Sequence, residues 1–127
     1  MKALSKSRFK LGLECPNKVY FSNNKDIFNN SKNEDPFLKA LASGGFQVEE
    51  YARLQYPEGK LIDAPYKDDN YQFFHDETKE LLKKDNVTIF EAGFLYQSLF
   101  IRTDILVKKE NEIKLIEVKA KSYDPRE

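Results

Sequence analysis

The sequence contains few of the residues from which many functional sites are built. It has a single cysteine, Cys15, and a single histidine, His75, among its 127 residues. One cysteine excludes an internal disulfide framework and any zinc site that draws several cysteines from this chain. The fold must therefore be stabilised by a hydrophobic core rather than by cross-links.

Long apolar runs and an excess of charge of either sign are also missing. No run approaches the roughly 20 apolar residues that cross a bilayer, and the first residues do not resemble a signal peptide. We therefore expect a cytoplasmic protein with no membrane partner. The 21 basic and 21 acidic residues give a formal net charge of zero, so the overall charge does not attract nucleic acid. Any nucleic-acid partner has to be inferred from local chemistry.

What is present is the composition of one folded domain. Hydrophobic residues make up 40% of the chain and aromatic residues 13%, which is too many for a disordered protein. A chain of this size buries roughly 65–70% of its unfolded surface. We expect one domain over residues 1–127, mainly helical over 1–86 and a β-meander over 87–121.

Capping residues predict helices in the first part of the chain. Ser5 is a suitable N-cap for a short helix that ends before Pro16. Asp35 and Pro36 suit the cap and first turn of a second helix. A third helix is expected over residues 70–84, where lysines occupy the last turn. Leu61 and Ile62 predict a short strand between the second and third helices.

From residue 87 onward the hydrophobic pattern changes to that of β-strands. Runs rich in Ile, Val, Phe and Leu cover residues 87–96, 99–108 and 113–121. Short polar breaks at 97–98 and 109–112 separate these runs. The pattern predicts a three-strand antiparallel meander.

Three acids occupy strand positions where a packed sheet would prefer apolar residues. Symmetric turns about 97–98 and 110–111 place Glu91 opposite Asp104, and Asp104 opposite Glu117. Opposed side chains have Cβ atoms roughly 4.5–5.5 Å apart, and like charges at that separation are destabilising. The sequence therefore predicts an acidic rung across the sheet that requires compensation.

Such a rung can be stabilised in more than one way. A raised carboxyl pKa would keep one acid neutral, or a cation could lie between the carboxylates. Arg102 and Lys119 are opposed in the same register and would supply basic groups beside the acids. A hard divalent cation would also fit, because Mg²⁺ prefers carboxylate oxygens and keeps several waters. All of these remedies remain open at this point.

Residues 102–106 (Arg-Thr-Asp-Ile-Leu) and 115–119 (Leu-Ile-Glu-Val-Lys) resemble the Asp…Glu-x-Lys signature of the PD-(D/E)XK nuclease superfamily. The opening segment 4–18 resembles that of RecB-like exonucleases, including CRISPR-associated ones. Together with residues 90–94 it looks most similar to an uncharacterised bacterial branch of that group. The resemblance implies an α/β, restriction-endonuclease-like core, with N-terminal helices packed on a mixed sheet that begins with the meander.

The same resemblance implies a site. Asp104 and Glu117 match the metal-binding acids, and Lys119 matches the catalytic lysine that positions or activates the attacking water. The implied cofactor is Mg²⁺ or Mn²⁺, and the implied partner is DNA. Glu91 and Arg102 lie beside these residues as accessory groups, for an outer contact to the metal or a simple ion pair.

The family often adds a metal ligand from the helix that precedes the sheet. Glu49 and Glu50 lie in that position. We favour Glu50, because it falls one turn from Phe46 and Leu54 on a partly apolar helix face. A surface glutamate without a ligand role is the other interpretation.

Two features depart from the family pattern. A helix bearing Gln and Tyr normally follows the Glu-x-Lys strand, so the resemblance implies the N-terminal part of a longer, C-terminally truncated domain. Cys15 matches an early cysteine that binds an iron–sulfur cluster in some relatives. Since this chain has no other cysteine, it cannot form the cluster alone, and Cys15 is a candidate ligand only in a longer chain.

The sequence thus favours a magnesium- or manganese-dependent deoxyribonuclease. A catalytically inactive nucleic-acid-binding or scaffold domain with the same fold is the first alternative. A protein-interaction module with a structural acidic rung is the second.

Overall fold

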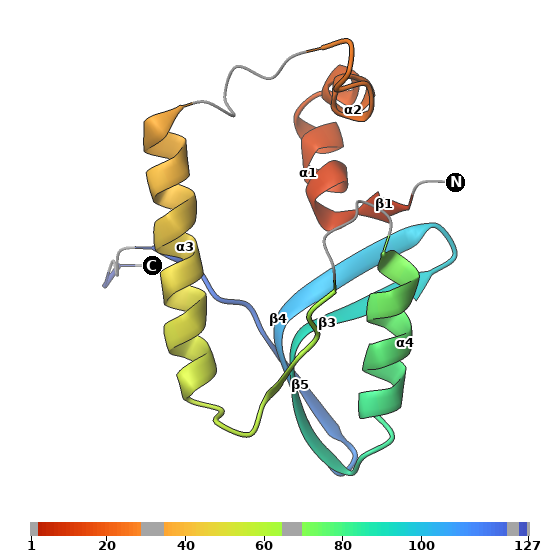
Figure 1. Cartoon of the computed structure of the whole chain (residues 1–127), viewed down its shortest axis with the longest axis vertical. Helices are drawn as coiled ribbons and strands as arrows, with labels where there is room; N and C mark the ends of the chain where they lie inside the picture. Colours follow the sequence, from red (N-terminus) through yellow and green to blue (C-terminus); the bar gives the residue numbers. More distant parts are fainter. Residues whose placement is uncertain (1–2, 29–34, 65–69, 122–124, 127) are drawn as a thin grey trace.

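The computed structural model describes residues 3–28, 35–64, 70–121 and 125–126. These residues form an α/β structure with a mixed sheet of five strands and four helices (Figure 1). In chain order the elements are β1 (Leu4–Ser5), α1 (Lys6–Glu14), α2 (Pro16–Asn23), α3 (Pro36–Leu54), β2 (Lys60–Leu61), α4 (Tyr71–Leu81), β3 (Asn86–Tyr96), β4 (Leu99–Lys109) and β5 (Glu112–Ile116). None of the helices in the described ranges is both long enough and apolar enough to span a bilayer.

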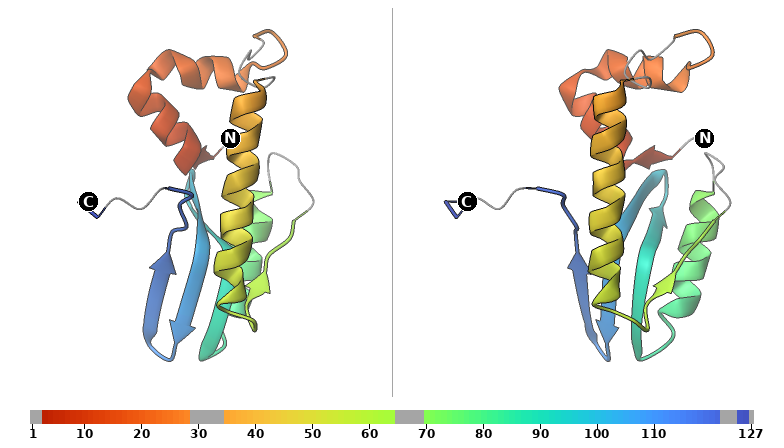
Figure 2. Two further views of the ribbon diagram at one scale, coloured as in Figure 1. Left: turned by 90° about the vertical axis from the view of Figure 1, so that its left-hand side faces the viewer. Right: turned by 60° about the vertical axis from the view of Figure 1, so that its left-hand side comes forward.

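The long strands β3, β4 and β5 form two antiparallel hairpins, and Figure 2 shows them side by side. Phe90 pairs with Ile105 across the first hairpin, and Leu106 pairs with Leu115 across the second. These pairs match the register that symmetric turns at 97–98 and 110–111 predict. The local turn chemistry was therefore a sufficient guide to both hairpins.

The strand order of the complete sheet differs from the predicted meander. The order is β1-β4-β3-β2, with β5 also paired to β4. Leu4 pairs in parallel with Leu99, and Lys60 pairs in parallel with Ile89, so β1 and β2 precede the meander in the chain and extend the sheet. A two-residue strand is too short to show a hydrophobic period, which is why this part of the sheet order was not predictable.

Strand β5 is also shorter than predicted, ending at Ile116 rather than at residue 121. The backbone N–H of Val118 does not continue the ladder and instead donates to Asp104 Oδ2 at 2.6 Å. A side-chain acceptor on β4 thus replaces the next main-chain bond. Residues 117–121 consequently lie outside the strands of the sheet.

Two of the predicted helix starts are confirmed by their caps. The Ser5 hydroxyl accepts the N–H of Arg8 at 3.3 Å, and Asp35 Oδ1 accepts the N–H of Phe37 at 2.8 Å. Helix α2 was not predicted, although Pro16, which ends α1, is also the first residue of α2. Proline suits a first helical position because its missing N–H would have no partner there.

The core lies between α4 and the strands β3 and β4. Its fully or nearly fully buried members are Ile62, Ile89, Ala92 and Leu106. Thr78 of α4 is completely buried, but its hydroxyl accepts the N–H of Gly93 at 2.9 Å and donates to the carbonyl of Phe74 at 2.7 Å. Buried polar groups persist when they are hydrogen-bonded in this way, and these bonds attach α4 firmly to β3.

The predicted packing of the N-terminal helices on the sheet is confirmed for α4, which buries Thr78 against β3. The other three helices, α1, α2 and α3, have no buried residue. Both views in Figure 2 place α1 and α2 beyond one end of the strands, with α3 standing alongside. This arrangement leaves a hollow between α1, α3 and the sheet.

Candidate functional site

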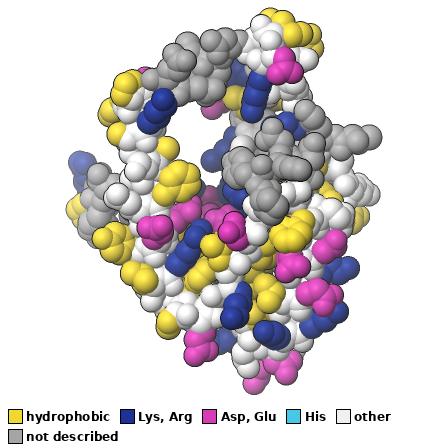
Figure 3. All heavy atoms as spheres, viewed as in Figure 1, with side chains coloured by type: hydrophobic (Ala, Val, Ile, Leu, Met, Phe, Trp, Pro, Cys, Tyr) yellow, Lys and Arg dark blue, Asp and Glu magenta, His cyan; other side chains and the backbone are white. Residues whose placement is uncertain are grey.

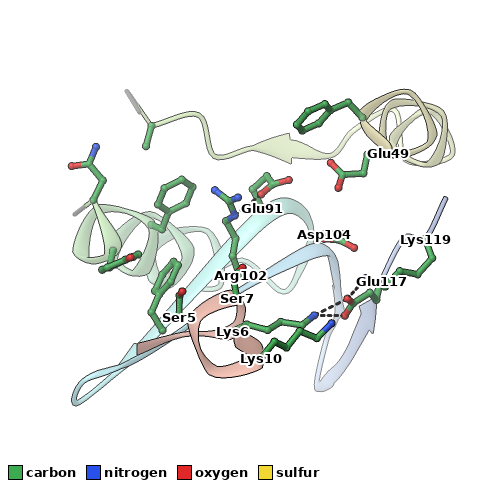
Figure 4. Close-up of a pocket in the computed structure, with 16 residues that line it drawn as sticks. Ser5, Lys6, Ser7, Lys10, Glu49, Glu91, Arg102, Asp104, Glu117 and Lys119 are labelled. Carbon is green, nitrogen blue, oxygen red and sulfur yellow. Dashed lines mark hydrogen bonds and ion pairs between the residues drawn. The ribbon is translucent and has the colours of Figure 1, made fainter. Parts of the chain in front are cut away.

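A cavity of about 500 Å³ lies where α1, α3 and α4 approach β3 and β4. We call it the central cavity. Its charged lining residues are Lys6, Lys10, Glu49, Glu91, Arg102, Asp104, Glu117 and Lys119. Figure 3 shows acidic side chains gathered beside an opening, with lysines and arginines at its margins, and Figure 4 shows the lining in close-up. Acids and bases from distant parts of the chain therefore meet in one place.

Asp104 lies on β4 and is half-buried. Its Oδ2 atom accepts the Val118 N–H, which joins β4 to the segment that carries Glu117 and Lys119. Within the described ranges, no lysine or arginine lies within ion-pair distance of Asp104. The carboxylate is thus held in place by a backbone bond but is not neutralised by a basic partner.

Glu117 follows β5 directly and has two basic partners. The Lys6 ammonium lies 2.6 Å from Oε1 and 2.7 Å from Oε2, and the Lys119 ammonium also donates to Oε1. The hydrogen bonds from Lys119 and Lys6 lower the pKa of Glu117 to about 2. This carboxylate therefore stays ionised throughout the neutral and mildly acidic range.

The low pKa of Glu117 predicts a pH-dependent contribution to stability. Because the folded-state pKa of about 2 is below the ordinary value of 4.5, the contribution is complete above about pH 4.5 and disappears as the pH falls toward 2. Thermal unfolding of the wild type and of Glu117→Gln should therefore differ in Tm at pH 7, with the wild type higher, and converge near pH 2. An equal Tm difference at both pH values would show that the charge of Glu117 is not the source of the stabilisation.

Lys119 lies in the field of several acids. The hydrogen bond to Glu117 raises the pKa of the Lys119 amine, and the nearby charges of Glu117, Asp104 and Glu49 raise it further. Figure 4 shows the Lys119 and Glu117 side chains joined, although β5 ends before both residues and the predicted shared strand face is therefore not formed. The ammonium is therefore positioned among the acids of the central cavity.

Glu91 does not take part in the predicted acidic rung. Its backbone is left-handed, with φ 62°, and it is absent from the β3–β4 pairs although its neighbours Phe90 and Ala92 are paired. The rung of three directly opposed acids is consequently not formed, because Glu91 leaves the ladder and β5 ends before Glu117. The three acids share the central cavity instead.

The Glu91 carboxylate forms an ion-pair network with two arginines. Arg102 Nε lies 2.7 Å and Arg53 Nη2 lies 2.8 Å from its oxygens, and Arg53 also reaches Glu49 at 3.4 Å. Burial raises the pKa of Glu91, and the positive charge of Arg102 opposes that shift. Arg102 also lies 5.4 Å from the ring centroid of Phe74. The network fixes Arg102 against the cavity wall, and the expected pairing of Arg102 with Lys119 does not occur because β5 stops at residue 116.

The helix position chosen for a third acid needs correction. Glu49 lines the central cavity together with Phe46, whereas Glu50 lies outside it, beside a neighbouring hollow that also contains Glu49. The prediction assumed that Leu54 marks the inward face of α3, but Leu54 is 73% exposed. Since successive helical residues are rotated by about 100°, Glu50 falls outside the central cavity that Glu49 lines, although both glutamates line the neighbouring hollow.

Two residues of the site were not selected from the sequence, and one candidate lies elsewhere. Lys6 was not selected, because no pattern in the sequence connects it with Glu117. Arg53 could have been found from its i,i+4 spacing to Glu49. Cys15 lies at the junction of α1 and α2, is partly buried and does not line the central cavity.

The donor chemistry of the site suits a divalent cation. Mg²⁺ prefers oxygen ligands and is usually bound by one or two carboxylates plus waters. Asp104 and Glu117 provide two such carboxylates on one cavity. No group of three or more acidic, histidine or cysteine side chains within the described ranges is arranged to hold a metal ion. A cation held here would have Asp104 and Glu117 as its protein ligands, with water completing the coordination.

No family model matches the chain, and neither a curated protein nor a solved structure matches it. A functional interpretation must therefore be argued from the residues of the central cavity.

Proposed function

We propose that the chain is a metal-dependent nuclease domain of the PD-(D/E)XK type, with a restriction-endonuclease-like fold, that hydrolyses phosphodiester bonds of DNA. The observation that supports this proposal most is the convergence of Asp104, Glu117 and Lys119 on the central cavity. These residues come from two separate segments, and each matches a position of the Asp…Glu-x-Lys signature. The hydrogen bond from Val118 to Asp104 joins the two segments directly.

Asp104 and Glu117 would hold Mg²⁺ or Mn²⁺ through their carboxylate oxygens. When bound, the metal ion would absorb charge from the phosphate oxygens and lower the pKa of a water molecule, which is the chemistry that phosphodiester hydrolysis needs. The Val118 N–H fixes the orientation of the Asp104 carboxylate. Preorganised ligands of this kind avoid reorganisation during the reaction.

Lys119 contributes positive charge next to the acids. A cationic side chain at the site of developing negative charge stabilises the transition state of phosphoryl transfer. The hydrogen bond to Glu117 and the charges of the surrounding acids raise the pKa of the Lys119 amine, so it stays protonated near neutral pH. In this role Lys119 would orient the attacking water and the phosphate rather than act as a neutral base.

Basic side chains of the central cavity would suit a polyanionic substrate. Lys10 and Arg102 line the cavity, and Arg102 is held in place by Glu91 and Phe74. Lysine and arginine contacts to phosphates provide most sequence-independent affinity for DNA. Local basic groups thus supply the attraction that a net charge of zero does not.

A catalytically inactive nucleic-acid-binding domain is the second candidate. The observation that favours it is the neutralisation of Glu117 by two lysines, with no group of three metal-ligating side chains in the described ranges. Such a domain would bind DNA without cutting it. Metal-dependent cleavage separates the two candidates.

The proposal is tested by incubating the purified chain with end-labelled linear DNA, single-stranded and double-stranded, in Mg²⁺ or Mn²⁺. We expect cleavage with either ion and none in EDTA, because the two carboxylates require a cation to act on a phosphate. Denaturing gels measure the products. DNA binding without cleavage in both metals would support the inactive domain instead.

A further inference from the structure

The position of Lys6 is set by the first strand of the sheet. The Leu4 N–H donates to the carbonyl of Ser98 at 2.6 Å, and β1 pairs in parallel with the start of β4. Ser5 then caps α1, so Lys6 becomes the first residue of that helix. The sheet and the cap together direct this lysine to the wall of the central cavity, although 111 residues separate it from Glu117.

The Lys6 ammonium lies almost symmetrically between the two carboxylate oxygens of Glu117. Its distances to Oε1 and Oε2 are 2.6 and 2.7 Å, and Figure 4 shows both contacts as dashed lines. This is the place that a metal ion chelated by the same carboxylate would take. The Lys119 ammonium, which also binds Oε1, comes from the same segment as Glu117, whereas Lys6 comes from the opposite wall.

Two ammonium groups and a divalent cation are not compatible on one carboxylate. Glu117 carries one negative charge, while Lys6 and Lys119 already bring two positive charges into contact with it. Adding a divalent ion at contact distance would cost Coulomb energy that increases as the effective dielectric falls. Lys6 is the group that can leave, because Lys119 is tethered two residues from Glu117, whereas Lys6 reaches Glu117 from another element and can swing away on its flexible four-carbon stem.

We infer that Lys6 is an internal competitor of the divalent cation: its ammonium occupies the cation's place on Glu117, and the metal must displace it in order to bind. The inference rests on the proposed function, since it assumes that Glu117 is a metal ligand. Lys6 therefore lowers the affinity of the chain for Mg²⁺ or Mn²⁺. Once displaced, the ammonium remains at the wall of the cavity as a cationic group.

The test measures Mn²⁺ binding without DNA, by titrating the protein and following the electron paramagnetic resonance signal of free Mn²⁺. Lys6→Met should bind Mn²⁺ about tenfold more tightly than the wild type, which corresponds to about 1.4 kcal/mol. Lys10→Met is the matched control, because it removes the same charge from the same helix and cavity without removing a contact to Glu117. Because Lys10 makes no contact with Glu117, its Coulomb repulsion of the cation is weaker and is further reduced by roughly 0.15 M salt, so the control should change the affinity by less than about threefold.

Further variants connect the effect to Glu117 and to folding. The double variant Lys6→Met with Glu117→Gln should lose the gain in affinity, since the two residues act on one site. Lys6→Gln, a polar neutral replacement, should repeat the gain, and circular dichroism verifies that each variant is folded. If the wild type binds Mn²⁺ and Lys6→Met binds it no more tightly, the inference is wrong and the proposed function stands. If neither protein binds Mn²⁺ at millimolar concentration, both the inference and the proposed function are wrong.

Discussion

Replacing Glu117 or Lys119 by alanine is expected to reduce metal-dependent DNA cleavage at least about 10²–10³-fold, the loss typical of removing one group that stabilises transition-state charge. Glu117→Ala removes a carboxylate proposed to hold the cation. Lys119→Ala leaves both carboxylates in place but removes the ammonium at Glu117 Oε1. Single-turnover cleavage of end-labelled DNA in Mg²⁺ measures both losses.

The two variants should differ in metal binding. Glu117→Ala should weaken Mn²⁺ binding, whereas Lys119→Ala should bind Mn²⁺ at least as tightly as the wild type, because it removes a positive charge and not a ligand. Glu112→Ala and Lys114→Ala are matched controls, since both residues are exposed on β5 and lie outside the central cavity. Both controls should cleave DNA like the wild type. Cleavage that survives in Glu117→Ala and Lys119→Ala alike would place the active site elsewhere or identify a contaminating nuclease.

Gly93→Ala is expected to lower the free energy of unfolding by about 2–3 kcal/mol, within the range for forcing extra atoms into a packed core. A Cβ atom at this position would lie 2.5 Å from the Cβ of Phe74 and 3.1 Å from Cε2 of Phe100. The Phe74 atom is attached directly to the backbone of α4, so it cannot rotate away. The helix would have to move from β3, which would also strain the bond between the Gly93 N–H and Thr78.

Thermal or urea unfolding measures the effect, and for a chain of this size we expect the Tm to fall by roughly 10 °C. Gly44→Ala is the control, because nothing lies within 4 Å of the added methyl group on α3. It should raise the unfolding free energy by about 0.5–1 kcal/mol through helix propensity alone. A Gly93→Ala protein as stable as the wild type would show that α4 does not pack on β3 as closely as the structure indicates.

Short-range chemistry explains why much of the fold could be predicted. Ser5 and Asp35 cap their helices through bonds to N–H groups two or three residues away. The hairpin turns at 97–98 and 110–111 likewise depend only on their immediate neighbours, and they set the pairs of β3, β4 and β5. Pro16 both limits α1 and begins α2, and only its effect on α1 was predicted.

The part of the site that depends on the register of the hairpins was predicted. Asp104, Glu117 and Lys119 were identified from the strands, and the structure places all three on the central cavity. The opposed rung was wrong because Glu91 adopts a left-handed conformation, which a periodic pattern cannot reveal. Glu50 was chosen over Glu49 for a related reason. No residue of α3 is buried, so its hydrophobic pattern does not show which face of the helix turns toward the sheet.

The sequence by itself determined the helix caps and the two hairpins, because these depend on contacts between neighbouring residues and on a period of two. Only the tertiary structure decided which charges compensate the acids beside those hairpins. Lys6 reaches Glu117 across 111 residues, and Arg53 reaches Glu91 across 38. Such pairs have no signature in the local sequence, since their partners are selected by the parallel pairing of β1 with β4 and by the placement of α3.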